Sequence, residues 1–569
     1  MTDSTDEEQL KKIYNAFEED AKKYTDRIKD SKSLKKVVAA GPGTGKTNLF
    51  KEVLEDKDKA LVLTFINALV EELHVQLPGF VTVKTLHGYA RSILTTAKYE
   101  TLVFNELPDI IAEDARILGL KDEKFESKIR NLANKKELEF YLKRKKYYGN
   151  YYSHDDLIYK AVELLEIEPD KIEVFGQILV DEFQDFNDLE IALIDQLSSC
   201  SPLLVAGDDD QSLYGFRDSM YRHIRNRHST NDEEFESFNL PYCFRCPKVI
   251  VDAVNDVLDF AKAQGLLTER IDKPFKYIRS EKKDNISIRF PDIIHSERQE
   301  NAICTFIEKE LEKIVKAEDT DFNVLIITPY SATLFKSRLI QQMRKKGFGN
   351  VGPDQKEKHK LLIKGLGLIL ETGQQYSNLG WRIVAQDILD EPKFKSILEK
   401  SLKTTDPFYK LLDPEMRSGI RKIIVSLRKL IESNPIDDVE REKLWNFLGI
   451  DVINSINTNI KSSFRSLSHP GLSPGIRNLP IKVTNVLKSK GLSADYVFIT
   501  HLDDRFFLEE DGKVVEKDIF NFIVALSRTK KQAYLMSMPG NKSTLIEVIE
   551  KGKASIINRA NRTSSDGFV

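Results

Sequence analysis

The sequence predicts an α/β fold with two parallel-sheet domains, each interrupted by a mostly helical insertion. Short β-branched apolar runs such as KALVLTF and QILVDEF alternate with helical patterns, which is typical of parallel strands covered on both faces. Near the N-terminus, the run LKKVVAA, a glycine-rich loop and a helical pattern follow one another. A second alternation begins near residue 236; it includes FNVLIITPY and returns late in the chain as ADYVFITHL.

The order of these patterns divides the 569 residues into four parts. We expect a first sheet domain over residues 1–95 and 171–235, with a helical insertion over 96–170. We expect a second sheet domain over 236–349 and 478–569, with a second helical insertion over 350–477. This chain length allows several folding units.

Composition indicates a globular chain without a membrane segment. The hydrophobic fraction is 41% and the charged fraction 31%, and no run reaches eighteen apolar residues. The N-terminus MTDSTDEEQLKK is polar and acidic and does not resemble a signal peptide, so a cytoplasmic location is expected. The formal net charge is −3, so any contact with nucleic acid must be a local groove.

The four cysteines do not form a disulfide framework. Cys243 and Cys246 form a CxxC pair, but Cys200 and Cys304 do not supply two more ligands at a spacing that suits zinc. A metal or redox role for the pair is therefore disfavoured, since the pair also falls inside the motif LPYCFRCP.

The segment AGPGTGKT between the first strand and its helix predicts a nucleotide-phosphate loop. Glycines let the backbone N–H groups turn toward phosphates, and the following helix adds the positive end of its dipole. Lys46 would contact the β- and γ-phosphates, and Thr47 would ligate Mg²⁺. The predicted nucleotide-binding residues are Ala40, Gly41, Pro42, Gly43, Thr44, Gly45, Lys46, Thr47 and the adjacent Asn48.

Two acidic residues directly follow the buried run ILV in the segment ILVDEF. Asp181 would hold Mg²⁺ through water, and Glu182 suits a general base that orients the attacking water. A nucleotide kinase or a small GTPase does not need this carboxylate pair, whereas a hydrolytic motor does. The alternative, a solvated turn after a strand, is disfavoured by the phosphate loop upstream.

The segment VAGDDDQSLYGFRDS ends another strand. Gln211 is a neutral residue suited to sensing a γ-phosphate. Tyr214, Phe216 and Arg217 combine aromatic rings with a cation, as in platforms on which single-stranded bases stack. Packing in the core is the alternative for each aromatic residue.

The segment KRKKYYGNYY, residues 143–152, combines four cations with four tyrosines. Such a composition suits phosphate and base contacts. A solvated loop is the more common interpretation, and both remain open from the sequence.

Together these motifs resemble the UvrD/Rep/PcrA group of superfamily 1A DNA helicases over the length of the chain. AGPGTGKT, DEFQD and GDDDQSLYGFR are similar to its nucleotide motifs. LPYCFRCP, KSKGLSADYVFI and FIVALSRTKK resemble its later motifs, in the same order. The resemblance implies two RecA-like P-loop domains and an ATP- and Mg²⁺-dependent helicase that moves 3′ to 5′ on single-stranded or tailed duplex DNA.

The resemblance also assigns roles to individual residues. Phe244 would stack on adenine, while Arg245 and Arg528 would reach the γ-phosphate as arginine fingers beside Glu182 and Gln211. The residues expected to contact DNA are Phe65, Asn67, His87, Tyr214, Phe216, Arg217 and Lys490.

Four positions depart from the family pattern. Gln9 lies too far before the loop to serve as the adenine-reading glutamine. Ser493 replaces a ribose-binding glutamate, Leu487 replaces a histidine, and Asn48 stands where an arginine often follows the loop. These changes predict looser nucleotide selection.

Two other functions stay open from the sequence. One is a DNA translocase that unwinds poorly. The other is an ATP-switched component of a nuclease-containing complex in DNA repair or phage defence, with the nuclease as its protein partner.

Overall fold

The computed structural model resolves two compact units. Unit 1 contains residues 1–89, 165–354 and 468–569, and unit 2 contains residues 90–164 and 355–467. The structure describes residues 18–55, 57–65, 70, 73–74, 77–120, 124–213, 215, 218, 221–229, 234–277, 292–317, 322–329, 333–346, 348, 360–370, 376–431, 480–504 and 513–558.

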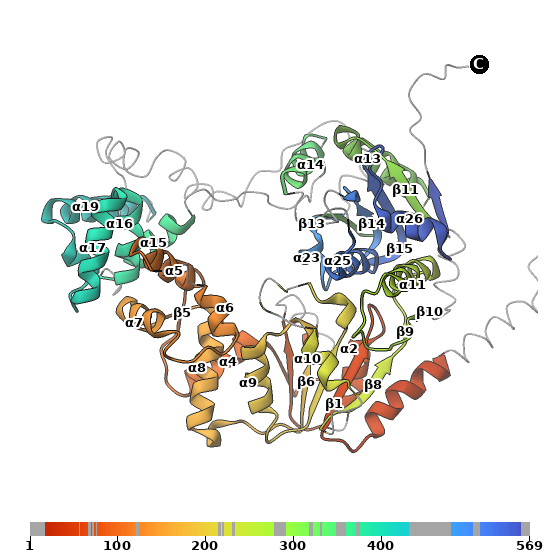
Figure 1. The fold of residues 1–569 in the computed structure, drawn as a ribbon, viewed down its shortest axis with the longest axis horizontal. Coiled ribbons are helices and arrows are strands. Elements are labelled where there is room, and N and C mark those ends of the chain that lie inside the picture. The colour runs from red at the N-terminus through yellow and green to blue at the C-terminus, as the bar shows by residue number, and fades with distance from the viewer. Residues whose placement is uncertain are drawn as a thin grey trace, which may run out of the picture. The chain divides into compact units, whose positions relative to one another are not determined.

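A first six-stranded parallel sheet forms the N-terminal part of unit 1 (Figure 1). Its strands, in lateral order, are β3 (Val81–Thr85), β2 (Ala60–Thr64), β6 (Gln177–Val180), β7 (Leu203–Gly207), β1 (Lys35–Ala40) and β8 (Glu236–Leu240). Every residue of β2, β6 and β7 is buried, as expected for parallel strands covered on both faces. Strand β8 pairs with β1, so the first sheet continues past residue 235, the predicted end of the first domain.

Helices and 3₁₀ turns flank the first sheet. They are α2 (Lys46–Leu54), α4 (Leu86–Thr96), η1 (Pro169–Lys171), η2 (Phe183–Asp185), α9 (Asp188–Leu197), η3 (Asp209–Gln211) and α10 (Arg222–Arg227). Residues 18–30 are also helical, and Ile28 of this helix is buried in the core of the first sheet. The short parallel pair β9 (Tyr242–Cys243) and β10 (Lys276–Tyr277) follows β8.

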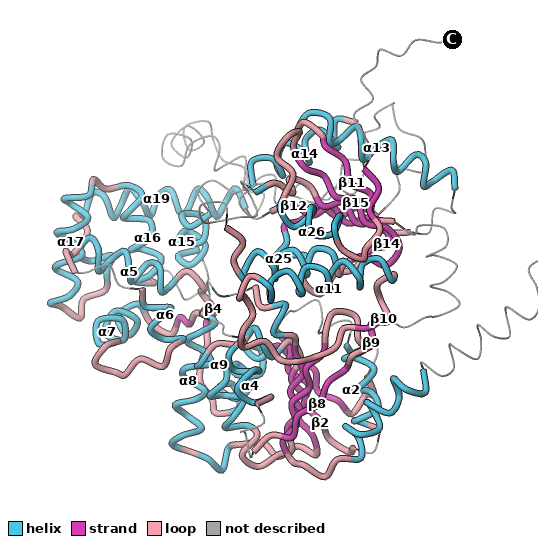
Figure 2. Tube along the Cα trace, turned by 45° about the vertical axis from the view of Figure 1, so that its right-hand side comes forward, coloured by secondary structure: helices cyan, strands magenta, loops and turns pink. Residues whose placement is uncertain are grey.

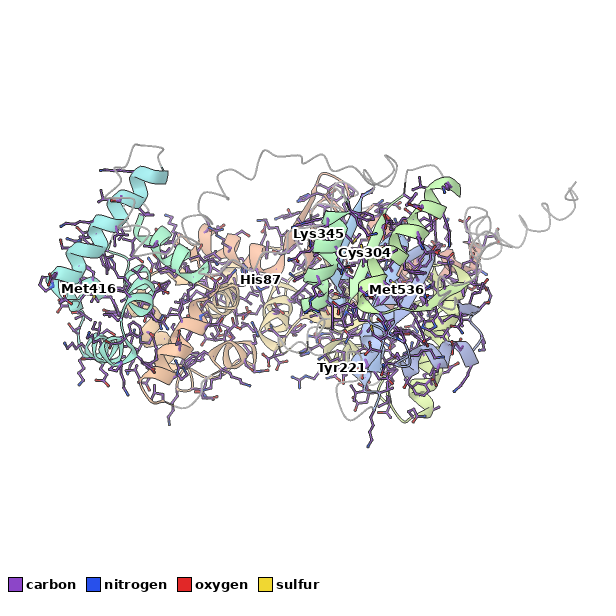
Figure 3. The ribbon with its side chains drawn as sticks, turned by 90° about the horizontal axis from the view of Figure 1, so that it is seen from above. His87, Tyr221, Cys304, Lys345, Met416 and Met536 are labelled. Atoms are coloured by element: carbon purple, nitrogen blue, oxygen red, sulfur yellow. The ribbon has the colours of Figure 1, made fainter. Side chains whose placement is uncertain are left out.

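A second six-stranded parallel sheet forms the rest of unit 1, and Figure 2 shows the strands of both sheets in magenta. Its strands, in lateral order, are β13 (Ile481–Asn485), β12 (Val324–Thr328), β14 (Ala494–Ile499), β15 (Thr529–Ser537), β11 (Ile293–Glu297) and β16 (Ile556–Asn558). Its helices are α11 (Lys248–Ala263), α13 (Glu300–Ala317), α14 (Thr333–Lys345), α23 (Val486–Ser489), α25 (Glu516–Leu526) and α26 (Thr544–Lys551). Cys304 and Met536, labelled in Figure 3, are buried together in one hydrophobic core of this domain.

The two sheets share one topology. When the strands of each sheet are numbered by their order in the chain, both sheets read third, second, fourth, fifth, first, sixth. The insertions enter at different points, after the third strand in the first sheet and after the second strand in the second sheet. The fold is therefore α/β with two RecA-like domains, as the sequence predicts.

Unit 2 is mostly helical and contains both insertions. Its elements are β4 (Leu102–Val103), α5 (Leu107–Ile117), α6 (Phe125–Arg130), α7 (Glu139–Tyr148), β5 (Tyr151–Tyr152), α8 (His154–Ile167), α15 (Lys360–Leu370), α16 (Asn378–Ile388), α17 (Glu391–Lys403), α18 (Phe408–Leu411) and α19 (Pro414–Ile431). One hydrophobic core joins the insertions, because Ile117 is buried with Leu366, Trp381 and Phe394. Among the described helices of the whole chain, none has both the length and the apolar character that a membrane span requires.

Candidate functional site

The phosphate loop connects β1 to α2 in the geometry that its glycines permit. Gly43 and Gly45 have φ values of 69° and 89°, in the left-handed region that favours glycine. A Cβ atom on Gly43 would lie 2.4 Å from Cβ of Arg245, so this close approach also requires glycine. The Phe244 N–H donates to the carbonyl of Gly43 at 2.9 Å, which fastens the loop to the segment carrying both residues.

Asp181 and Glu182 directly follow β6, beside the phosphate loop. Glu182 has a φ of 53°, an uncommon conformation for a residue other than glycine. Its carboxylate lies 3.4 Å from Nζ of Lys46 and 3.7 Å from Nζ of Lys490. Gln184 donates to the Oε2 oxygen of Glu182 at 2.7 Å. The carboxylate is thus fixed at the Lys46 end of the loop.

The two neighbouring carboxyl groups titrate differently. Burial raises the pKa of Asp181, and the negative charge of Glu182 raises it further. Burial would also raise the pKa of Glu182, but the cations of Lys46 and Lys490 lower it well below its usual range. Glu182 is therefore ionised at neutral pH, the form that can accept a proton.

Gln211 is bonded by groups from both domains. Its side-chain Nε2 donates to Asp208 at 2.6 Å, and its Oε1 accepts from Nη2 of Arg528 at 2.8 Å. Lys490 donates to its main-chain carbonyl at 2.6 Å and to Asp185 at 2.8 Å. This fixes both ends of the Gln211 amide.

Arg528 reaches the site from the start of β15. The residue is 2% exposed, and its guanidinium also donates to the carbonyl of Val524 at 2.9 Å. Burial and the nearby cation of Arg245 lower the pKa of Arg528 to about 10, so it stays charged at neutral pH. Arg245 is half-buried beside it.

A cavity of about 520 Å³ brings these groups together. Its lining residues are Gly41, Pro42, Gly43, Thr44, Gly45, Lys46, Thr47, Asp181, Glu182, Gln211, Phe244, Arg245, Gly491, Ser493, Asp495, Arg528, Lys530 and Lys531. In the first domain, lining residues lie at the carboxyl ends of β1, β6 and β7. In the second domain, they lie at the amino ends of β14 and β15. Its loop backbone and cations match the charge of a nucleoside triphosphate.

A second cavity, of about 430 Å³, adjoins the first and shares Thr44, Gly45 and Phe244 with it. Its remaining lining residues are Glu18, Ala21, Lys22, Thr25, Asn48, Glu52, Leu240, Pro241 and Tyr242. Phe244 is 46% exposed, which leaves ring surface available to a flat ligand. The two cavities suit a phosphate chain and a base.

The predicted DNA contacts are only partly within the described residues. Asn67, Tyr214, Phe216 and Arg217 lie outside them. The Phe65 ring meets Phe186 edge to face, with 5.9 Å between centroids.

Two further predicted DNA contacts make interactions inside the protein. His87, labelled in Figure 3, lies 3.5 Å from a carboxylate oxygen of Glu190. Lys490 is 4% exposed, and its ammonium donates to the carboxylate of Asp185 and to the main-chain carbonyl of Gln211. Their contact with DNA stays a prediction.

The tyrosine- and lysine-rich segment 143–152 is not a solvated loop, which corrects the more common interpretation. Most of it forms α7, where Arg144 is 1% exposed and pairs with Asp114 at 3.0 Å. Lys145 pairs with Asp156 at 3.1 Å and lies over the Tyr152 ring. Several of these side chains therefore form ion pairs within unit 2. The composition of the segment does not reveal these partners.

The cysteine pair is part of a hydrophobic core. Cys243 and Cys246 are fully buried, and the Cys246 N–H donates to Sγ of Cys243 at 3.4 Å. Leu487, which replaces a histidine of the family pattern, packs against the same core. Ser493 lines the phosphate-side cavity and Asn48 the base-side cavity.

The structure adds residues that sequence reasoning missed. Asp185 binds Lys490, Asp495 lines the cavity, and Arg270 and Lys273 bind the aspartates before Gln211. Asp185 belongs to DEFQD, so the motif could have signalled it. Arg270 and Lys273 belong to no motif, and only their folded position shows their partners.

Comparison with known proteins identifies related chains. The family model described as "UvrD/REP helicase N-terminal domain" matches residues 115–232. The "ATP-dependent DNA helicase srs2" of Schizosaccharomyces pombe is 31% identical over 20% of this chain and 13% of its own length.

Two bacterial relatives match longer segments. The "ATP-dependent DNA helicase PcrA" of Staphylococcus aureus is 26% identical over 41% of this chain and 39% of its own length. A Lactococcus lactis protein, named as one subunit of an ATP-dependent helicase/nuclease, is 28% identical over 27% of this chain and 12% of its own length. The matches thus span well under half the length of each relative. Together with the two RecA-like sheets and the phosphate loop, these matches make the chain similar to the UvrD/PcrA-type superfamily 1A helicases.

Proposed function

We propose that this protein is an ATP-dependent DNA helicase that moves 3′ to 5′ on single-stranded DNA. One observation carries the proposal: both RecA-like domains contribute residues to a single cavity with a phosphate loop, a carboxylate and arginines. The S. pombe and S. aureus relatives are both named ATP-dependent DNA helicases, which supports it. The direction of movement rests on the family resemblance.

The cavity residues fit ATP together with Mg²⁺. Lys46 and the loop N–H groups would bind the phosphates, and Phe244 would stack on the base. The Thr47 hydroxyl and the Asp181 carboxylate, both in the cavity lining, are hard oxygen ligands suited to Mg²⁺. When bound, Mg²⁺ would neutralise charge on the β- and γ-phosphates.

Hydrolysis would use groups already held in position. Glu182 would orient a water molecule and accept its proton as the water oxygen attacks the γ-phosphorus and the bond to the β–γ bridging oxygen breaks, which releases ADP and phosphate. Arg245 and Arg528 would stabilise the charge that develops on the phosphate oxygens. Gln211, bonded to Arg528, would sense whether the γ-phosphate is present.

Movement would follow from the shared site. The second domain supplies Arg528 and Lys490, while the first supplies Glu182, Asp185 and Gln211. Loss of the γ-phosphate would therefore weaken the interactions between the domains in each cycle. We expect one nucleotide of DNA to be passed per ATP, as the resemblance implies.

The matched L. lactis relative favours a second candidate function. That protein is named as part of a helicase/nuclease, and the similarity covers 27% of this chain. The protein would then act as an ATP-driven component beside a separate nuclease, and unwind poorly by itself.

ATP hydrolysis with and without single-stranded DNA tests the proposal, followed by unwinding of 3′-tailed and 5′-tailed duplexes. DNA-stimulated turnover and displacement of the 3′-tailed duplex alone are expected, and Glu182→Gln serves as the inactive control. Stimulated turnover without displacement would favour the translocase or the nuclease-associated function. Turnover that ignores DNA would contradict a DNA motor.

A further inference from the structure

A buried cluster of six charged side chains includes the three aspartates that directly precede Gln211 in the chain. Its carboxylates are Asp208, Asp209 and Asp210, which are 0%, 0% and 3% exposed. Its cations are Arg225, Arg270 and Lys273, so the formal charges cancel. Burial of three adjacent carboxylates would be very costly without these partners.

Lys273 is the centre of the cluster. Its Nζ lies 3.0 Å from Asp208 and 2.9 Å from Asp210, and it also pairs closely with Asp209. Three oxygens of these aspartates lie within 4.8 Å of one another, a spacing that could suit a metal ion. The ammonium of Lys273 already satisfies them, so this cluster needs no metal.

The other two cations complete the pairing. Arg270 donates to Asp210 at 2.8 and 3.0 Å, and Arg225 donates to Asp209 at 2.9 Å. Burial disfavours the charged form of Lys273, but Asp208, Asp210 and Asp209 together raise its pKa above the ordinary value. The lysine therefore stays charged.

The cluster joins the two RecA-like domains. Arg270 and Lys273 lie between α11 and β10, and the flanking Leu267 and Phe275 are buried in a core of the second domain. Asp208 follows β7 of the first sheet. Two cations anchored on the second domain thus hold the segment that leads into Gln211.

We propose that Lys273, assisted by Arg270, is a positioning residue for ATP hydrolysis: it fixes Asp208, which in turn holds the side-chain amide of Gln211. This inference rests on the proposed function. Asp208 is the link, because it binds Lys273 through one oxygen and Gln211 through the other, at 2.6 Å. Without the ammonium, the Asp208 carboxylate would lose its charge partner and the Gln211 amide would lose its fixed orientation toward Arg528.

A double-mutant cycle tests this chain of contacts. Lys273→Met, Gln211→Ala and the double variant are compared by steady-state ATP hydrolysis at saturating single-stranded DNA. Lys273→Met should lower kcat by about tenfold or more and change KM by less than about twofold, as expected when transition-state positioning is lost. In the Gln211→Ala background, Lys273→Met should have almost no further effect, because residues that act through one another are not additive.

Lys36→Met is the matched control. Lys36 is also a buried lysine of unit 1, but its Nζ donates to the carbonyls of Ile28 and Ser31. Its kcat should stay near that of the unchanged protein even if its melting temperature falls. Additive effects of Lys273→Met and Gln211→Ala on kcat would overturn the inference, and so would an equal kcat loss in Lys36→Met.

Lys273→Arg keeps the test decisive if Lys273→Met does not fold. A guanidinium cannot place one nitrogen among three carboxylates as an ammonium does, so kcat should fall severalfold, again without additivity to Gln211→Ala. Unchanged kcat in Lys273→Arg would overturn the inference. Nucleotide hydrolysis that ignores DNA would refute the motor function instead, and the cycle could still be measured on that basal activity.

Discussion

Lys46 and Glu182 form an ion pair in the cavity, with 3.4 Å between Nζ and Oε1, yet we expect them to serve different steps. Lys46→Ala removes a phosphate contact and should weaken nucleotide binding as well as abolish hydrolysis. Glu182→Gln removes the base and leaves the phosphate contacts, so ATP should still bind without turnover. Equilibrium binding of a fluorescent ATP analogue, with hydrolysis measured in parallel, separates the two. Wild-type turnover in Glu182→Gln would show that another group is the base.

Arg528 combines burial with a direct bond to Gln211, which suits an arginine finger. Arg528→Ala should lower turnover by a factor on the order of 10³ while nucleotide affinity changes little. Single-turnover hydrolysis and nucleotide binding are the measurements. Arg338→Ala is a control, because Arg338 pairs with Glu300 on the exposed surface. Weaker ATP binding with unchanged turnover would make Arg528 a binding residue instead.

At the scale of secondary structure elements, three of them line the base-side cavity: the helix of residues 18–30, α2 and the strand β9 with its flanks. Phe244 offers a ring for stacking, which discriminates poorly between bases. On the ribose side, Ser493 lacks the reach of the family's glutamate. The base-side cavity therefore offers a general stacking surface, and the adjoining phosphate-side cavity offers a short polar side chain.

These two adjoining cavities predict loose nucleotide selection. GTP and dATP should be hydrolysed with kcat/KM within about tenfold of ATP, equivalent to about 1.4 kcal/mol. Steady-state hydrolysis of ATP, dATP, GTP and CTP with single-stranded DNA measures this. Ser493→Glu restores the family carboxylate and should increase the preference for ATP over dATP. A preference for ATP of a hundredfold or more in the unchanged protein would mean that another residue reads the base and ribose.

At the scale of the whole molecule, a buried ion network joins the two helical insertions into unit 2. Asp114 is fully buried and accepts from Arg144 at 3.0 Å and from Arg382 at 2.7 Å, a residue 268 positions away. Tyr148 also donates to Asp114, and Ser401 accepts from Arg144 at 3.0 Å. Both guanidiniums thus share the buried carboxylate of Asp114, and Arg382 also lies 3.7 Å from the partly exposed carboxylate of Glu113.

Asp114→Asn should destabilise unit 2 by about 3–5 kcal/mol, because it removes the buried countercharge that two buried cations share. Urea unfolding followed by tryptophan fluorescence measures this, since Trp381 is buried in the hydrophobic core of unit 2. Glu139→Gln, which removes an exposed pair with Lys143, should change stability by less than about 1 kcal/mol. Equal unfolding midpoints for the two variants would refute the role of the network.

The sequence by itself determined the fold class and the nucleotide motifs, because these depend on local patterns. A buried strand must be apolar, and a phosphate loop needs glycines at fixed spacing, as Gly43 and Gly45 show. The parallel strand order places AGPGTGKT, DEFQD and Gln211 at the carboxyl ends of neighbouring strands in the first sheet. Their proximity was therefore predictable.

Only the tertiary structure decided contacts between distant segments. Strand β8 joined the first sheet because β1 had a free edge to pair with it, which no local pattern reveals. The lysine- and tyrosine-rich segment 143–152 became largely internal because Asp114 and Asp156 lie opposite Arg144 and Lys145. The burial of Lys273 likewise depends on the tertiary structure, because a buried charge is stable only where opposite charges from elsewhere in the chain surround it.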